Sequence, residues 1–277
     1  GQRKLTTMII RKILASSIFA LISTLTHIRE RLERMLKKEQ MERFDADELL
    51  GDDEPDFMAD VEEDTEDSYE ETDMFDEDDA ISIPKLKAEI ALLNSFIAKA
   101  KKIRKESKAD ALLAALKESF KIQSKSGAQR KALIFTESTK TQAFLRDSLE
   151  ANGYEGKIVL FNGKASEPQT NEIYKKWCDA HPDKVSGIKA ADRRAAIVDY
   201  FKNSAEIMIA TEAASEGLNL QFCSLVINYD LPWNPQRIEQ RIGRCHRYGQ
   251  KNDVVVVNFI NTRNYADVRV FDLLCKK

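Results

Sequence analysis

The chain has 277 residues, of which 43% are hydrophobic and 32% are charged, and its formal net charge at pH 7 is −3. A hydrophobic share of this size supplies the core of one large or two small domains, so the composition excludes a chain too polar to fold. Twenty of the 46 acidic residues and none of the 43 basic residues fall within residues 45–79. The rest of the chain is therefore basic, which favours contact with a polyanion such as nucleic acid.

Residues 1–44 are predicted to form a helical extension. Seven apolar side chains recur there every three or four residues, as in an amphipathic helix: Leu14, Ile18, Leu21, Leu25, Ile28, Leu32 and Met35. The apolar stretch 13–25 follows basic residues and so imitates a signal peptide or a membrane span. It is too short to cross a bilayer, contains three serines and lacks a small-residue cleavage site, so we expect neither.

The acidic residues 45–80 are predicted to be a disordered linker, because so many like charges cannot bury enough apolar surface to fold alone. An alternative is that this segment mimics the charge of DNA and covers the basic surface when no DNA is bound. Residues 81–126 are predicted to form a helical subdomain. Its expected core positions are Leu86, Ile90, Leu93, Ile97, Leu112, Leu113 and Leu116.

Strands and helices alternate over residues 127–277, which predicts an α/β fold with a parallel sheet flanked by helices. The expected strands are apolar runs at 131–135, 158–161, 207–210, 226–229 and 254–260. The last run is almost uninterrupted, as in strands that are buried on both faces of a sheet. Residues 164–190 interrupt the alternation and are predicted to be a surface insertion with one amphipathic helix.

A helix is predicted between the last two strands. Asn234 is a good N-cap, Pro235 is a good first helical residue, and Gly249 stands where a helix would stop. Three long polar side chains on this helix, spaced by four and three residues, project from one face: Gln240, Arg244 and Arg247. Two guanidinium groups on one face suit the phosphates of a nucleotide, although an isolated pair at this spacing would more simply be surface charge.

Residues 230–250 contain D-L-P-W-N-P followed by Q-x-x-x-R-x-x-R-x-G-Q, which closely resembles motif VI of the helicase-like ATPases of the Swi/Snf-related family, in its bacterial RapA-type branch. Residues 211–220 resemble motif V of that family, and residues 131–139 resemble motif IV. The resemblance implies that residues 127–277 form the C-terminal RecA-like lobe of a superfamily-two helicase. DEAD-box relatives would have His at position 240 and would lack the ending Tyr248-Gly249-Gln250, so a double-stranded DNA translocase is implied rather than an RNA helicase.

The resemblance also implies roles for individual residues. Arg244 and Arg247 would be arginine fingers for ATP hydrolysis, and three residues would approach the nucleotide: Gly217, Asn219 and Gln240. Nucleic acid would be contacted by Thr136, Ser138, Asn162, Gly163, Thr211 and Trp233. A hydroxyl at a strand end can donate to a phosphate oxygen, and a glycine lets the backbone approach a ligand closely. For Trp233, a place in the core is the alternative.

The chain contains no phosphate-cradling sequence of the form G-x-x-x-x-G-K-[ST]. The resemblance then implies that ATP with Mg²⁺ is held mainly by a first RecA-like lobe, and that this chain is inactive alone. The implied partners are double-stranded DNA, the N-terminal lobe of the same protein and a DNA-bound complex such as RNA polymerase, with no membrane.

Two other classes of function stay open at this point. The chain could be a nucleic-acid or protein interaction module that kept the fold, or a lobe of an RNA helicase. Four scattered cysteines and three scattered histidines predict neither a metal site nor a disulfide framework. Together with the lack of an export signal, they predict a cytoplasmic protein, associated with the nucleoid if the source is bacterial.

Overall fold

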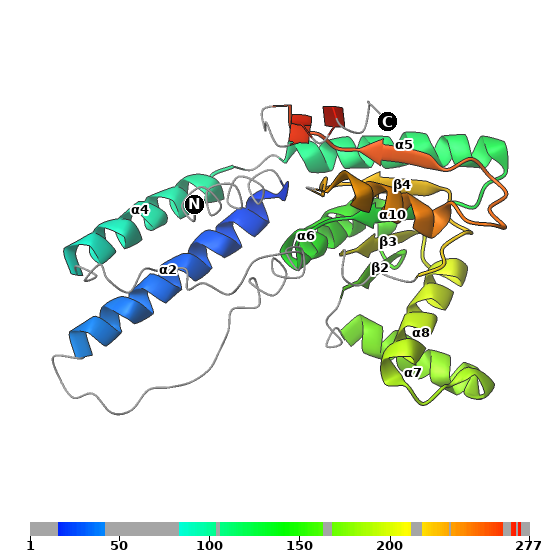
Figure 1. Cartoon of the computed structure of the whole chain (residues 1–277), viewed down its shortest axis with the longest axis horizontal. Coiled ribbons are helices and arrows are strands. Elements are labelled where there is room, and N and C mark those ends of the chain that lie inside the picture. The colour runs from blue at the N-terminus through cyan, green and yellow to red at the C-terminus, as the bar shows by residue number, and fades with distance from the viewer. Residues whose placement is uncertain are drawn as a thin grey trace. The chain divides into compact units, whose positions relative to one another are not determined.

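The computed structural model describes residues 16–41, 83–103, 106–162, 168–211, 218–232, 234–262, 267–269 and 271–272. The chain divides into two compact units, residues 1–106 and residues 107–277 (Figure 1). Within the described ranges, no helix is both long enough and apolar enough to cross a membrane. The acidic segment 45–80, which is predicted to be a disordered linker, lies outside the described residues. Leu14, the first predicted apolar position of the helical extension, also lies outside them.

The described part of the N-terminal unit contains two antiparallel helices, α2 (Ile18–Met41) and α4 (Ile83–Lys101). Their direction follows from two contacts: the backbone N–H of Ile18 donates to the Glu106 carboxylate, and Arg29 Nη1 donates to Asn94 Oδ1 over 3.5 Å. Four of the predicted apolar positions are buried, Leu25 and Leu32 on α2 and Leu86 and Ile97 on α4. The other described members of these two stripes are half-buried.

The C-terminal unit contains a five-stranded parallel sheet, as the alternation of elements predicted. In chain order the strands are β1 (Ala132–Phe135), β2 (Ile158–Phe161), β3 (Ile207–Ala210), β4 (Leu225–Asn228) and β5 (Val255–Asn258). Their order across the sheet is β2-β3-β1-β4-β5. Phe135 lies opposite Ala210 on β3 and opposite Asn228 on β4, so the carboxyl ends of these strands meet at one edge.

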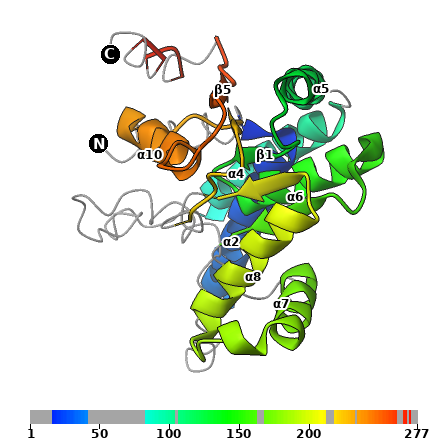
Figure 2. The same ribbon diagram turned by 90° about the vertical axis from the view of Figure 1, so that its right-hand side faces the viewer.

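Helices cover both faces of this sheet. They are α5 (Ser107–Ser126), α6 (Thr139–Leu149), α7 (Pro168–Ala180), α8 (Lys189–Asn203) and α10 (Pro235–Cys245), with a π-helical turn at Glu150–Tyr154 and a 3-10 turn at Pro182–Lys184. Alternate strand residues face α5 and α6 on one side and α7, α8 and α10 on the other, and Figure 2 shows α5 and α10 on opposite sides of the sheet. The expected helix of the 164–190 insertion is α7.

Two expectations differ from the structure. The helical subdomain predicted at 81–126 is divided, because α5 buries Leu112, Leu116 and Phe120 against the sheet and belongs to the C-terminal unit. The expectation that the last strand is buried on both faces is wrong. Among the described strands β5 pairs with β4 alone, Val255 is 37% exposed, and the other residues of β5 are half-buried.

Candidate functional site

The helix α10 begins as its sequence predicted. Asn234 Oδ1 accepts a hydrogen bond of 3.0 Å from the backbone N–H of Gln236, and Pro235 is the first helical residue. The predicted end is wrong, because α10 stops at Cys245, before Arg247. Arg247 instead folds back, and its Nε donates to the carbonyl oxygen of Gly243 over 2.9 Å. The charge of Arg247 therefore stays at the C-terminal end of α10.

The two other long polar side chains of this motif lie on the helix itself. Gln240 is exposed, and Arg244 is half-buried on the last turn. The Nε atom of Arg244 is buried and has no hydrogen-bond partner within the described part of the chain. A buried donor without a partner is uncommon in proteins, so this guanidinium is suited to an anion that is not part of the chain.

The end of α10 is joined to the segment that follows β3. The backbone N–H of Leu220 donates to the carbonyl oxygen of Arg244 over 2.9 Å. Gln250 Nε2 donates to the carbonyl oxygens of Cys223 and Cys245 over 3.0 and 3.2 Å. Motif V and motif VI thus meet, and the exposed Asn219 lies one residue from this junction. Gly217, the other predicted nucleotide-contacting residue of motif V, lies outside the described residues.

A second group of predicted residues lies where β1, β2 and β3 end. Asn162 follows β2, and its Nδ2 donates to Gln142 Oε1 over 2.8 Å. Gln142 Nε2 in turn donates to the carbonyl oxygens of Phe161 and Ile209, which ties α6 to both strands. Thr211 follows β3 and is buried. The structure therefore brings the described strand-end residues to one edge, where open parallel sheets usually bind ligands.

Like Asn162, two more of the predicted nucleic-acid contacts have hydrogen-bond partners inside the protein. The hydroxyl of Thr136 donates to Asp230 Oδ2 over 2.6 Å, and Thr136 is fully buried. Ser138 Oγ caps α6 by accepting from the backbone N–H groups of Lys140 and Thr141. Ser138 is half-buried and keeps access to solvent, whereas Thr136 offers no side-chain surface to a large ligand. Gly163 and Trp233 lie outside the described residues.

The sequence did not single out the buried charges beside this edge. Asp230 is 5% exposed, and its Oδ1 accepts a hydrogen bond of 2.8 Å from Lys108 Nζ. Arg241 is 1% exposed, and its Nη1 donates to Asn228 Oδ1 over 3.0 Å and to the carbonyl oxygen of Asp230 over 2.8 Å. For Arg241, the sequence did carry a signal. Its spacing from Ile238 and Cys245 places all three residues on one face of α10, and that face is buried.

Buried titratable groups also lie beneath the junction of the two motifs. A hydrogen bond with Cys223, together with burial, raises the pKa of the Cys245 thiol above its usual range. Burial lowers the pKa of Lys131, whose Nζ donates to the carbonyl oxygen of Phe201 over 2.8 Å. In the described ranges, no group of His, Cys, Asp and Glu side chains is arranged to hold a metal ion.

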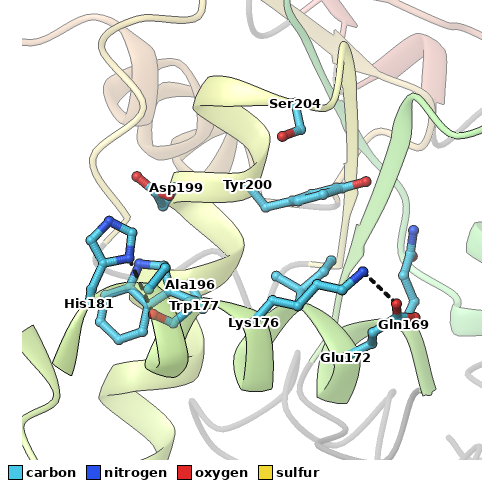
Figure 3. A pocket seen from close by; sticks show the side chains of 11 residues that line it. Gln169, Glu172, Lys176, Trp177, His181, Ala196, Asp199, Tyr200 and Ser204 are labelled. Atoms are coloured by element: carbon cyan, nitrogen blue, oxygen red, sulfur yellow. Dashed lines mark hydrogen bonds and ion pairs between the residues drawn. The ribbon is translucent and has the colours of Figure 1, made fainter.

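A separate groove of about 320 Å³ runs between α7 and α8 (Figure 3). Trp177 stacks on His181 at its floor, with ring centroids 5.5 Å apart, and Lys176 pairs with Glu172 at its rim over 2.7 Å. None of the predicted site residues that the structure describes lines this groove.

The chain is similar to helicase-family proteins over the part that holds this site. Residues 107–249 match the family model of the helicase conserved C-terminal domain. The chain is 39% identical over 147 residues to the uncharacterized ATP-dependent helicase YqhH of Bacillus subtilis. This match covers 53% of this chain and 22% of YqhH. It is 42% identical over 125 residues to the RNA polymerase-associated protein RapA of Serratia proteamaculans, covering 41% of this chain and 12% of RapA. Among solved structures, the C-terminal part of the Fun30 ATPase domain aligns at 20% identity with a TM-score of 0.44, over 70% of this chain and 55% of that one.

Proposed function

Because the chain belongs to the helicase conserved C-terminal domain family, as its motifs predicted, we propose that it is the C-terminal RecA-like lobe of an ATP-dependent double-stranded DNA translocase of the Swi/Snf-related, RapA-type group. In this proposal the chain supplies arginine fingers and DNA contacts to a motor whose first lobe holds the nucleotide. The observation that carries the proposal is the junction of motifs V and VI, which gathers Asn219, Arg244 and Arg247.

The donor set at this junction fits a nucleotide that is shared between two lobes. Guanidinium groups bind phosphate oxygens and repel Mg²⁺, so Arg244 and Arg247 suit the phosphates while the first lobe would hold the metal. When ATP with Mg²⁺ is bound, it supplies the phosphoryl group that passes to water. The role of Arg244 and Arg247 is to stabilise the negative charge that grows on that group in the transition state. The role of Gln240 and Asn219, both exposed, is to hydrogen-bond the nucleotide.

The proposed DNA surface is the carboxyl edge of the sheet. Ser138, Asn162 and Thr211 follow three neighbouring strands there, and Gly163 and Trp233 join them by the resemblance to the family. Thr136 is left out of direct contact because its side chain is 0% exposed and bonded to Asp230, whereas Thr211 keeps 7% of its surface exposed. A partner of the RNA polymerase kind is proposed because the RapA relatives are named RNA polymerase-associated proteins.

The first experiment mixes this chain with the separately produced first lobe and measures ATP turnover with and without duplex DNA. We expect no turnover from the chain alone and DNA-stimulated turnover from the mixture. Arg244→Ala and Arg247→Ala should each lower kcat by about a thousandfold or more, since an arginine finger contributes rate factors of that order. Arg146→Ala is the matched control, because Arg146 pairs with the exposed Asp147 on α6, and its loss should leave kcat unchanged.

The possible results separate the classes of function. Turnover by the chain alone would contradict the need for a first lobe. DNA binding without turnover in the mixture would favour an interaction module that kept the fold. Turnover that responds to RNA and not to duplex DNA would favour an RNA helicase lobe.

A further inference from the structure

Three charged side chains gather where β4 ends, and two of them, Asp230 and Arg241, are buried. Lys108 comes from α5, Asp230 follows β4, and Arg241 comes from α10. Lys108 Nζ lies 2.8 Å from Asp230 Oδ1 and 4.2 Å from the centre of the Tyr229 ring. The guanidinium of Arg241 lies over the Phe135 ring, at 4.8 Å from its centre.

The hydrogen bonds of Asp230 lead to two different parts of the site. On one side, Asp230 Oδ2 accepts from the Thr136 hydroxyl over 2.6 Å and from the backbone N–H of Glu137 over 3.2 Å. These two residues form the turn from β1 to Ser138, on the proposed DNA surface. On the other side, the carbonyl oxygen of Asp230 accepts from Arg241, which stands three residues before Arg244. Asp230 thus connects the proposed DNA surface to α10, the helix that carries Arg244.

Packing alone does not require these charges. Ile238 and Cys245 anchor the same face of α10 through apolar contacts, and a third apolar side chain could do so without the cost of removing charges from water. What charged hydrogen bonds add is direction: Arg241 Nη1 is held between Asn228 Oδ1 and the Asp230 carbonyl, which fixes the rotation of α10 about its own axis. Asn228 is itself fixed by a hydrogen bond of 2.7 Å from its Nδ2 to Asn258 Oδ1 on β5.

We propose that Asp230 is a positioning residue that couples the DNA-facing end of β1 to α10, with Lys108 and the buried Thr136 hydroxyl holding its carboxylate. The inference rests on the proposed motor function. In this arrangement Thr136 acts on catalysis through Asp230 and does not touch DNA. A displacement of the β1 turn by bound DNA moves Asp230, and Asp230 moves the helix that carries Arg244.

The test uses the two-lobe protein and two variants that remove the contacts to Asp230. Thr136→Val keeps the shape of a buried side chain and removes only its hydroxyl. Lys108→Met removes the ammonium that pairs with Asp230 and keeps an unbranched side chain of similar length. Each variant should lower the DNA-stimulated kcat by about fivefold or more, the usual scale of coupling between sites, while KM for ATP and Kd for DNA stay unchanged. Lys108→Arg should restore most of the stimulated rate.

Lys121→Met is the matched control, because Lys121 lies on the same helix and pairs with Glu118 only at the surface. Its stimulated kcat should equal that of the unchanged protein. A weaker Kd for DNA in Thr136→Val would overturn the inference, since it would make Thr136 a direct DNA contact. Unchanged stimulation in both variants would overturn it as well. If the unchanged two-lobe protein itself shows no DNA-stimulated ATP turnover, the result would instead refute the proposed function, on which the inference depends.

Discussion

Asp192 accepts three hydrogen bonds from the turn that precedes α8. They come from Ser186 Oγ over 2.6 Å, from the backbone N–H of Ser186 over 2.9 Å and from that of Gly187 over 3.2 Å. These bonds hold the pKa of the Asp192 carboxyl below its usual range, and the bond from the Ser186 side chain has the largest effect. Because the pKa is lower in the folded chain, the stabilisation is complete above the ordinary value of 3.8 and is lost as the pH falls through the lowered value.

Asp192→Asn should therefore lower the Tm of the protein at pH 7, and the difference from the unchanged protein should shrink towards zero at the acid end, where both carry a neutral side chain. Thermal unfolding followed by circular dichroism at several pH values measures this. Asp183→Asn, in the exposed turn nearby, should change the Tm little at any pH. A difference that stayed constant with pH would show that the charge of Asp192 contributes nothing.

Cys223 and Cys245 are both fully buried, and the pKa of the Cys245 thiol is raised by its contact with Cys223 and by burial. A protonated, inaccessible thiol reacts slowly, because the thiolate is the nucleophile. At pH 8 an alkylating reagent should leave both unmodified in the native protein and should modify both in urea, as peptide mass spectrometry would measure. The half-buried Cys178 should react faster than either. Rapid native alkylation of Cys245 would contradict the packing beneath motif VI.

At the scale of elements, the start of α6 serves structure and proposed function at once. Ser138 Oγ accepts from two N–H groups of the first turn, so Ser138→Ala should lower the free energy of unfolding by about 1 kcal/mol. Ser138→Asn and Ser138→Asp both keep a capping oxygen and should preserve stability. The Asp variant alone adds a negative charge at the proposed DNA surface, so it should weaken duplex binding most at low salt. Equal DNA affinity of the Asn and Asp variants would remove Ser138 from that surface.

Elements with a local cause could be predicted from the sequence. The four buried strands are short apolar runs, and α10 begins at an Asn-Pro pair that can cap and start a helix. The end of α10 was missed, because Gly249 was taken as the stop although the helix ends at Cys245. The edge position of β5 was missed for another reason: a run of valines has the same local pattern in a central strand and in an edge strand, and strand order depends on contacts between distant residues.

The same distinction applies to the site. Arg244, Arg247 and Asn219 could be predicted as site residues because they stand at fixed spacings within short motifs. Asp230 and Arg241 were not found, because their meaning depends on partners elsewhere in the chain, and the partner of Asp230 on α5 is 122 residues away. Whether Thr136 is exposed or buried was equally hidden, since a hydroxyl at the end of a strand can face either solvent or a neighbouring loop.

At the scale of the whole molecule, charge is the property that distinguishes one segment from the rest. Residues 45–79 hold 20 acidic and no basic residues, and the remaining chain has 26 acidic against 43 basic residues. The segment lies outside the described residues, but the elements on either side of it are defined. Since α2 and α4 are antiparallel, the end of α2 and the start of α4 lie at the same end of the pair (Figure 1). A linker of another composition can therefore replace the segment without pulling the two helices apart.

If the acidic segment competes with DNA for the basic surface, replacing residues 45–79 by a Gly/Ser linker of equal length should tighten duplex binding at low salt. The gain should shrink as salt rises, because both the segment and DNA are attracted through charges that salt screens. Titration of labelled duplex at several salt concentrations measures this, and a linker that keeps the acidic residues but scrambles their order is the control. If net charge alone drives the competition, the scrambled segment should behave like the natural one. Equal affinity of the neutral-linker protein and the unchanged protein at low salt would leave the segment as a simple spacer, because an attraction strong enough to cover the surface cannot be removed without a change in Kd.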